Sequence, residues 1–399
     1  MDPFPLTLPR CKKFSGYKPC FSYKNCLEHG CQYDVPDNHI GIKILIISLD
    51  AMGNVLYNTS ILPALKRKHP ESTIYWITMP SAEKILWYNP LIDRVLVWDE
   101  ESRMILRNIT FDYLLNADKT DYACSFANEV KATTKLGFLL NEDGKIIPAN
   151  KSALYNYRMG NDDELKFRKN QRSGIDILHE SFELEYRRDE CTFTFTEEEL
   201  RFIEKYKSQI DHDPAMTYVG FNTGCSNLFP NKKMTIDQHV TLIRSMANDK
   251  RLRLVLLGGK EDTERNEEIL RSLHPKIRRS VIATPTTQGL RKGACYMDIC
   301  DVVITGDSFG MHLAIALRKY VIAWFGLSCW TEIELYDRGE KLIPEGLECA
   351  PCWKKVCPYH LECIQMIDLN KIVSLVDAFA GKRTPPRTGA VQKRKRRKK

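Results

Sequence analysis

Short apolar runs alternate with longer amphipathic stretches along most of the chain. The alternation occurs twice, first from residue 42 to about 140 and again from 217 to 326. Short apolar runs are typical of buried strands, whereas the longer stretches carry apolar residues at helical spacing. Strands are expected at 42–48, 72–79, 94–98, 111–118, 135–140, 217–224, 251–259, 281–285, 301–307 and 321–326. Repeated strand–helix units predict an α/β fold with two Rossmann-like, doubly wound parallel sheets.

The two alternating sets are separated by a segment that breaks the rhythm. Residues 145–215 contain a long charged helical stretch, then an apolar run expected to be a strand leading into a helix. We therefore predict one domain at 41–212 and a second at 213–381, facing each other across a cleft. The cysteine-containing residues 1–40 form an N-terminal extension, and residues 382–399 form a tail. A chain of 399 residues is long enough for two such domains.

Charge is distributed unevenly along the chain. The formal net charge is +8, but residues 382–399 hold ten Lys or Arg and no acid, which leaves 49 basic against 51 acidic residues elsewhere. We expect this basic tail to be disordered; contact with an anionic surface, a lipid or a nucleic acid is the alternative. The folded part gives no sign of specific nucleic-acid recognition.

Composition indicates a soluble globular protein, with 43% apolar and 28% charged residues. No run approaches the roughly 20 apolar residues that a membrane helix needs. The first residues lack the apolar core of a secretion signal, so a cytoplasmic location is expected.

Fourteen cysteines in a chain with no export signal favour reduced thiols over a disulfide framework. Eight of them form two groups, Cys349, Cys352, Cys357 and Cys363 near one end and Cys11, Cys20, Cys26 and Cys31 near the other. The first group begins with CxxC and fits a tetrahedral iron or zinc site. The second has looser spacing, with ordinary buried or free thiols as the alternative. Neither shows an open coordination position, so any metal is expected to be structural.

Ligands of open α/β sheets bind at the carboxyl ends of the strands, so the loops there carry the candidate chemistry. The loop NTGCSNLFPNKK brings Thr223 and Gly224 close to a ligand, and Lys232 and Lys233 offer positive charge for a phosphate. After LVLLGG, Glu264 is placed to bind a ribose hydroxyl pair.

Two further loops have the same position after a strand. Asp307 and Ser308 precede a helix whose first turn holds Gly310, Met311 and His312, which predicts an anion or nucleotide site. An N-cap role for Asp307 and simple packing of His312 are the ordinary alternatives. The stretch LDAMGNVL, residues 49–56, predicts a strand, a tight glycine turn and a helix N-terminus that can also receive an anion.

These segments resemble a known family. KILIISLDAMGNVLYNTSILPALKRKHPESTIYWIT, with NPLIDRV after it, is similar to the amino-terminal domain of the ADP-heptose glycosyltransferases, a GT-B family that includes the lipopolysaccharide heptosyltransferases. GFNTG, LVLLGG and ITGDSFGMHLAIALRKYVIAWFG resemble its carboxy-terminal domain, and the likeness covers roughly residues 42–375. The cysteine-bearing ends, with CxPC, resemble the autotransporter heptosyltransferase branch, which modifies protein serines and carries an iron-binding cysteine finger.

The resemblance implies an inverting, metal-independent transfer of heptose from ADP-heptose to a hydroxyl of a protein or glycan. Residues 41–212 would then be the acceptor domain and residues 213–381 the nucleotide-sugar domain. A homo-oligomer is possible. The residues implied in donor binding are Thr223, Gly224, Lys232, Lys233, Glu264, Asp307, Ser308, Gly310, Met311 and His312.

Two positions depart from the family pattern. Phe309 stands where a small residue is usual, and the turn reads MGN, so Asn54 stands where the lipopolysaccharide enzymes have their proposed aspartate base. Asp118, followed by Lys119, resembles the acid of the autotransporter branch and is the preferred base; Asp50 or no carboxylate base are the alternatives. Asn54 is then expected to orient donor or acceptor.

Other functions remain open at this point. The chain could use another nucleotide sugar, or it could be a non-catalytic scaffold that binds nucleotide sugars. A third hypothesis is a nucleic-acid-binding protein that binds through the basic tail.

Overall fold

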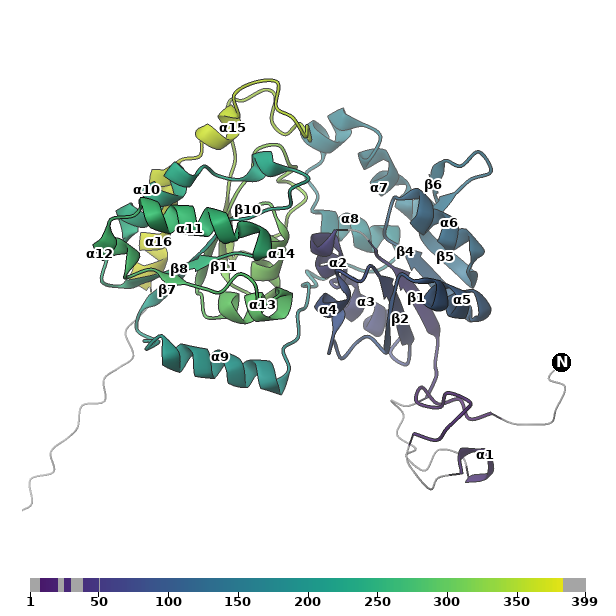
Figure 1. Cartoon of the computed structure of the whole chain (residues 1–399). Helices are drawn as coiled ribbons and strands as arrows, with labels where there is room; N and C mark the ends of the chain where they lie inside the picture. The colour runs from purple at the N-terminus through teal and green to yellow at the C-terminus, as the bar shows by residue number, and fades with distance from the viewer. Residues whose placement is uncertain (1–7, 21–24, 30–38, 50, 383–399) are drawn as a thin grey trace, which may run out of the picture.

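The computed structural model describes residues 8–20, 25–29, 39–49 and 51–382. Expectations for Asp50, Cys31 and residues 383–399 therefore lie outside the described residues. Within the described ranges, the chain forms two α/β domains that lie side by side, with the N-terminal extension below the first domain in the view of Figure 1.

The N-terminal domain is built on a six-stranded sheet with the order β3-β2-β1-β4-β5-β6. All neighbours are parallel except the antiparallel pair of β5 and β6. The strands are β1 (Lys43–Ile47), β2 (Thr73–Thr78), β3 (Arg94–Val97), β4 (Thr110–Asn116), β5 (Lys131–Leu140) and β6 (Ile146–Pro148). The helices between them are α2 (Met52–Asn58), α3 (Ile61–Lys68), α4 (Glu83–Leu86), α5 (Glu100–Asn108) and α6 (Asp121–Glu129).

The central strand β1 explains why this sheet is covered on both faces. Successive side chains of a strand point to opposite faces, and here Ile44 and Ile46 belong to a core that includes α2 and α3. Leu45 and Ile47 belong to a different core, which includes α5 and α6. The apolar run is therefore continuous because both of its faces are buried, as in parallel sheets generally.

The C-terminal domain repeats the architecture with the order β12-β11-β10-β7-β8-β9, and every pair is parallel. Its strands are β7 (Thr217–Asn222), β8 (Leu252–Leu257), β9 (Ile282–Ala283), β10 (Val302–Gly306), β11 (Tyr320–Trp324) and β12 (Gly339–Leu342). Its helices are α10 (Ile236–Met246), α11 (Thr263–Ser272), α12 (Pro275–Arg278), α13 (Leu290–Asp298), α14 (Phe309–Ala316), α15 (Glu362–Gln365) and α16 (Leu369–Lys382). The prediction of two doubly wound sheets is confirmed.

The segment between the sheets differs from the sequence expectation. One long charged helix was expected near residues 160–184, but the chain forms α7 (Leu154–Met159), a π-helical turn η3 (Leu165–Lys169) and α8 (Gly174–Ser181). The break has a local cause, because the Ser173 hydroxyl accepts a hydrogen bond from the backbone N–H of Asp176 and starts a new helix. The strand expected before α9 (Glu197–Gln209) is extended chain that pairs with no strand among the described residues.

The two domains share buried contacts. One hydrophobic cluster includes Ile44 of β1 and Val303 of β10, so the two cores are continuous. Arg291 of α13 is buried at this seam and donates hydrogen bonds to Glu199 of α9 (2.6 Å) and to the Lys84 carbonyl of α4 (2.8 Å). No helix in the described part of the chain is long and apolar enough to span a bilayer.

Candidate functional site between the two parallel sheets

Each sheet has one point where the strand order reverses. In the N-terminal sheet this point lies between β1 and β4, where Ile47 pairs with Asn116. In the C-terminal sheet it lies between β7 and β10, where Asn222 pairs with Thr305. Ligands of open α/β sheets bind at such switch points, outside the carboxyl ends of the strands. The candidate loops predicted from the sequence therefore belong to two switch points, one in each domain.

Asp118 lies at the N-terminal switch point, directly after β4. Its side chain is buried and accepts a hydrogen bond from the backbone N–H of Leu49 at the end of β1, so it bridges the two central strands. Asn116 orients the turn, because its side-chain oxygen accepts from the Asp118 N–H (3.1 Å) and its amide donates to the Phe138 carbonyl (2.8 Å). A carboxylate held in this way is fixed in one orientation, as a proton acceptor must be.

Asn54 and Lys119 lie near the same switch point. Asn54 is exposed on α2, at the turn that follows β1. Lys119 donates hydrogen bonds from its ammonium to the Asn156 carbonyl (2.7 Å) and side-chain oxygen (2.8 Å). Part of the Lys119 side chain is exposed, yet burial around its ammonium, together with the charge of Lys166, lowers its pKa to about 8. The loop is thus a region in which positive charge is already disfavoured.

Lys232 and Asp307 form a close ion pair at the C-terminal switch point. Lys232 ends the short helix η4 (Pro230–Lys232), and its Nζ lies 2.6 Å from Asp307 Oδ2. Trp324 of β11 fixes the lysine backbone by donating its indole N–H to the Lys232 carbonyl (2.9 Å). Burial by itself raises the pKa of Asp307, but Lys232 and His312 outweigh it, and the net pKa lies below the ordinary value.

The backbone before α14 is packed closely against Asn222. The Asn222 amide donates to the hydroxyls of Thr305 (2.9 Å) and Ser308 (3.1 Å). A Cβ at Gly310 would lie 2.5 Å from the Asn222 amide nitrogen, so only glycine permits this approach. Ser308, not Asp307, is the N-cap residue of α14. The side chain of Asp307 is committed to Lys232, and the N-cap alternative for it is wrong.

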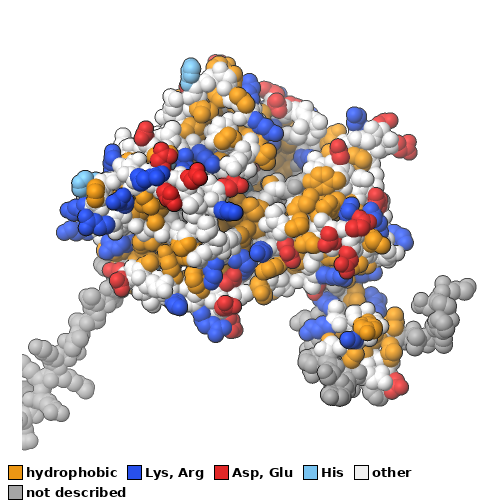
Figure 2. Space-filling view, in the orientation of Figure 1, with side chains coloured by type: hydrophobic (Ala, Val, Ile, Leu, Met, Phe, Trp, Pro, Cys, Tyr) orange, Lys and Arg blue, Asp and Glu red, His pale blue; other side chains and the backbone are white. Residues whose placement is uncertain are grey.

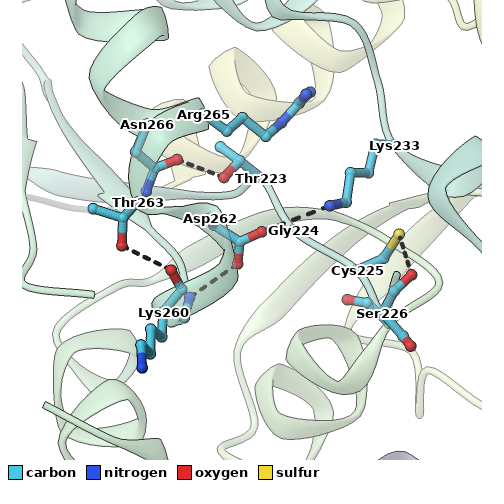
Figure 3. A network of polar contacts seen from close by, with 12 residues as sticks. Thr223, Gly224, Cys225, Ser226, Lys233, Lys260, Asp262, Thr263, Arg265 and Asn266 are labelled. Atoms are coloured by element: carbon cyan, nitrogen blue, oxygen red, sulfur yellow. Dashed lines mark hydrogen bonds and ion pairs between the residues drawn. The ribbon is translucent and has the colours of Figure 1, made fainter. Parts of the chain in front are cut away.

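Figure 3 shows the second half of the C-terminal site, at the end of β7 and the start of α11. The Thr223 hydroxyl donates to the Asn266 side chain (2.6 Å), and Lys233 pairs loosely with Asp262 (4.0 Å). A Cβ on Gly224 would lie 2.1 Å from an Asp262 oxygen, so the loop backbone and this carboxylate are in direct contact. Burial raises the pKa of Asp262.

Asp262, not Glu264, is the acid of this internal network, and the ribose contact expected of Glu264 stays a prediction. Glu264 is exposed on α11 and lies outside the contacts of Figure 3, whereas Asp262 is buried within them. Sequence reasoning missed Asp262. Its position directly before an amphipathic helix could have identified it, because acids are common at helix N-termini. Arg265 and Asn266 of the same helix were also missed.

His312 joins the two switch points. A Cβ on Gly53 of α2 would lie 2.9 Å from His312 Cδ2, and the Tyr57 ring meets the imidazole edge-on at 5.8 Å between centroids. Burial lowers the pKa of His312, with Lys232 acting in the same direction, so the imidazole is neutral near pH 7. The neighbouring Met311 is fully buried, and Phe309 packs against the shared core.

The cysteine groups give a mixed result. Within the described ranges, no three His, Cys, Asp or Glu side chains are arranged to hold a metal ion. Burial, with the charges of Cys352, Cys357 and Cys349 acting in the same direction, raises the pKa of the Cys363 thiol to about 11. In the amino-terminal group, Cys11 is buried and Cys20 is exposed.

Surface charge shows no single basic field on the face in view. In Figure 2, Lys and Arg side chains are interspersed with Asp and Glu side chains over this face. A nucleic-acid-binding surface would need clustered positive charge.

Comparisons with known proteins give a family match, partial relatives and structures of the same fold. The model of glycosyltransferase family 9 (heptosyltransferase) matches residues 103–362. Lipooligosaccharide heptosyltransferase 2 of Campylobacter jejuni serotype O:6 is 25% identical over 183 residues, 45% of this chain and 56% of that protein. The chain thus spans about half the length of this curated relative.

Two solved structures share the fold. The glycosyl transferase family 9 protein of Veillonella parvula superposes with a TM-score of 0.66 at 17% identity, covering 86% of this chain and 98% of that one. The ADP-heptose lps heptosyltransferase II of E. coli superposes with a TM-score of 0.62 at 17% identity, covering 85% and 98%. Both likenesses concern the two-domain GT-B fold.

Proposed function

The chain belongs to glycosyltransferase family 9 (heptosyltransferase), and on that basis we propose that it transfers heptose from ADP-heptose to a hydroxyl of a glycan or protein acceptor. The observation that carries the proposal is the meeting of the two switch points. The contact between Gly53 and His312 brings the turn after β1 against the start of α14, beside the ion pair of Lys232 and Asp307. An acceptor bound by one domain and a donor bound by the other would meet there.

The C-terminal switch point has the chemistry for a nucleoside diphosphate. Lys232 and Lys233 provide two ammonium groups, and the N-terminus of α14 adds backbone N–H groups and the positive end of the helix dipole. Gly224 and Gly310 let the Asp262 carboxylate and the Asn222 amide pack directly against the loop backbones. The ADP-heptose donor is supported by the name of the E. coli structure, and a glycan acceptor by the name of the Campylobacter relative.

Asp118 is the proposed base. The acceptor hydroxyl gives its proton to the Asp118 carboxylate, and the acceptor oxygen attacks the anomeric carbon from the face opposite the diphosphate. The bond from that carbon to the diphosphate oxygen breaks, and its electron pair stays on the phosphate, where the Lys232 and Lys233 ammonium groups stabilise the negative charge. The attack from the opposite face inverts the anomeric centre. Asn54, an amide that cannot take a proton, would orient donor or acceptor.

A structural iron or zinc on Cys349, Cys352, Cys357 and Cys363 is a further part of the proposal. It is supported by the four thiols and their CxxC spacing, which is typical of tetrahedral metal sites. No step of the transfer passes through this group. A protein acceptor, a homo-oligomer and contact of the basic tail with an anionic surface also remain proposals.

A non-catalytic scaffold is the second candidate, and the observation in its favour is the amide of Asn54 at the position of the expected base. Binding of a donor without turnover would distinguish it from the enzyme. A different nucleotide sugar is the third possibility.

The deciding experiment measures calorimetric binding of ADP-heptose, ADP and UDP, together with release of ADP from ADP-heptose in the same buffer. We expect binding of ADP-heptose and ADP with slow hydrolysis of the donor. Binding without release, even with candidate acceptors present, would favour the scaffold. Preference for UDP would refute the donor assignment.

A further inference from the structure

Two lysines from different domains lie against one indole ring. Lys166 belongs to η3, in the part of the N-terminal domain that follows its sheet, and its Nζ lies 5.3 Å from the centroid of the Trp353 ring. Lys232 of the C-terminal site has its Nζ 4.8 Å from the same centroid. The two ammonium groups can therefore be no further apart than the sum of these two distances, a span that one diphosphate group can bridge. Sequence reasoning assigned no role to Lys166 or Trp353.

The indole is held firmly in this position. Trp353 follows Cys352, and the backbone N–H groups of both donate to the Leu327 carbonyl (2.9 and 3.0 Å). The Phe229 ring meets the indole edge-on, with centroids 5.4 Å apart. The indole Nε1 is buried and has no hydrogen-bond partner among the described residues. A buried donor without a partner carries an energetic cost that a bound acceptor atom would remove.

The N-terminal domain also forms hydrogen bonds to the loop that carries Trp353. Arg168, two residues after Lys166, donates hydrogen bonds to the carbonyls of Ala350 (3.3 Å) and Glu348. In Figure 1 this loop, before α15, runs from the top of the C-terminal domain toward the segment around α7. The Asn231 amide, next to Lys232, donates to the Lys354 carbonyl (2.9 Å). The position of Lys166 relative to Lys232 is thus fixed from both sides.

The charges around the ring leave room for an anion. Each of the two lysines at the ring has one carboxylate partner, Glu332 for Lys166 and Asp307 for Lys232. The Lys166 Nζ is 3.7 Å from Glu332 Oε1, too long for a good hydrogen bond, and burial raises the pKa of Glu332. Asp307 is already paired with Lys232. Of the two lysines at the ring, Lys166 therefore has the weaker carboxylate partner.

We propose that Lys166 is a second phosphate-binding cation, which contacts the diphosphate of the nucleotide sugar from the N-terminal domain, opposite Lys232. Trp353 is a positioning residue, because its indole ring lies within cation–π distance of both ammonium groups. The proposal rests on the proposed function, because it assumes a nucleoside diphosphate donor. It extends that function by giving the N-terminal domain a direct contact with the leaving group, so that the diphosphate links the two domains.

The test compares ADP with AMP in calorimetric titrations of the full chain. Charge-assisted hydrogen bonds are about twice as strong as neutral ones, so removing one weakens binding measurably. We therefore expect Lys166→Gln to weaken ADP binding roughly tenfold or more and AMP binding much less, because AMP lacks the β-phosphate. Lys166→Arg should restore most of the preference for ADP. The matched control is Lys169→Gln, in the same turn, because the Lys169 side chain is 68% exposed and lies 3.8 Å from Glu164.

Two results would overturn the proposal. The first is an unchanged ratio of ADP to AMP affinity in Lys166→Gln, measured on a folded variant with the wild-type melting temperature. The second is an equal loss for both nucleotides, which would point to disturbed packing. If the wild-type protein prefers UDP, the donor assignment fails. The ratio of UDP to UMP affinity then tests the role of Lys166 in the same way. Wild-type protein that binds no nucleotide refutes both.

The positioning role of Trp353 is tested by the same ratio of ADP to AMP affinity. Trp353→Phe keeps an aromatic face for the two cations, so we expect the preference for ADP to survive in it. Trp353→Leu should lose a large part of that preference. A residue that only stabilised the loop would change the melting temperature in both variants without separating ADP from AMP, and that pattern would contradict the positioning role.

Discussion

Removal of the Lys232 ammonium should leave a buried carboxylate without its main partner. In the folded protein Lys232 Nζ lies 2.6 Å from Asp307 Oδ2, and both side chains are 13% exposed. The other ionisable neighbour of Asp307 is His312, whose imidazole is neutral near pH 7 because burial lowers its pKa. Lys232→Met keeps much of the side-chain volume, so the loss is mainly electrostatic.

The size of the effect follows from the geometry. At an effective dielectric constant of about 20, unit charges at this separation attract by roughly 6 kcal/mol before the cost of burying them is subtracted. Breaking a buried pair by removing one partner typically costs about 3–5 kcal/mol. Because both side chains keep some exposure, we expect the lower end, about 3 kcal/mol of unfolding free energy at pH 8.

The loss of unfolding free energy in Lys232→Met, called the deficit below, should depend on pH in a defined direction. In the wild type the pKa of Asp307 is lowered, so its ionised form stabilises the fold above the unfolded-state pKa of about 3.9, and this is lost as pH falls through the lowered pKa. Without Lys232 the folded-state pKa should rise above the unfolded value. Ionisation then destabilises the fold, so the deficit is largest at pH 8 and shrinks as pH falls toward about 5.

The assay is urea unfolding at pH 8 and pH 5, followed by circular dichroism, for Lys232→Met, Asp307→Asn and the double variant. The double variant should be more stable than Lys232→Met alone, with a coupling energy of about 2–3 kcal/mol. The control Lys169→Met should stay within about 0.5 kcal/mol of wild type, because exposed pairs contribute little. A deficit equal at both pH values, or additive single effects, would refute the reasoning.

The remaining predictions concern three other positions. Asp118→Asn should lower turnover about 100-fold or more while donor binding changes little, because an amide can still accept the Leu49 N–H but cannot take a proton; unchanged turnover would move the base elsewhere. Gly53→Ala should lower the unfolding free energy by about 1–3 kcal/mol, since its Cβ would lie 2.9 Å from His312; in a thermal melt, Gly293→Ala is the control, because nothing lies within 4 Å of its Cβ. Cys352→Ser should release metal and lower the melting temperature if the carboxy-terminal thiols hold a structural ion; unchanged metal content would count against that site.

The comparison of sequence and structure is clearest for the acids of the site. The place of Asp118 at the switch point could be predicted from the sequence, because it follows an apolar strand and ligands bind at strand ends; its role as the base stays a prediction. Glu264 and Asp262 could not be separated in this way, since both follow the same strand within a few residues. Their difference depends on which side chain the helix turns toward Gly224, and the structure turns Asp262 there.

The segment between the domains shows a second limit. Its charged stretch has helical composition, and a helix was expected throughout, but Ser173 caps a new helix and divides it. The resulting turn η3 directs Lys166 toward Trp353, nearly two hundred residues later in the chain. Local propensity carries no information about such a contact.

The sequence by itself determined the two doubly wound sheets, the family and the loops that carry the candidate chemistry. These are encoded locally, because buried parallel strands require continuous apolar runs and a close backbone approach requires glycine. Only the tertiary structure decided which charges pair, namely Lys232 with Asp307 and Lys233 with Asp262, and that Lys166 meets Lys232 over one indole. Pairing of this kind depends on distances between chain segments far apart in sequence, which folding alone fixes.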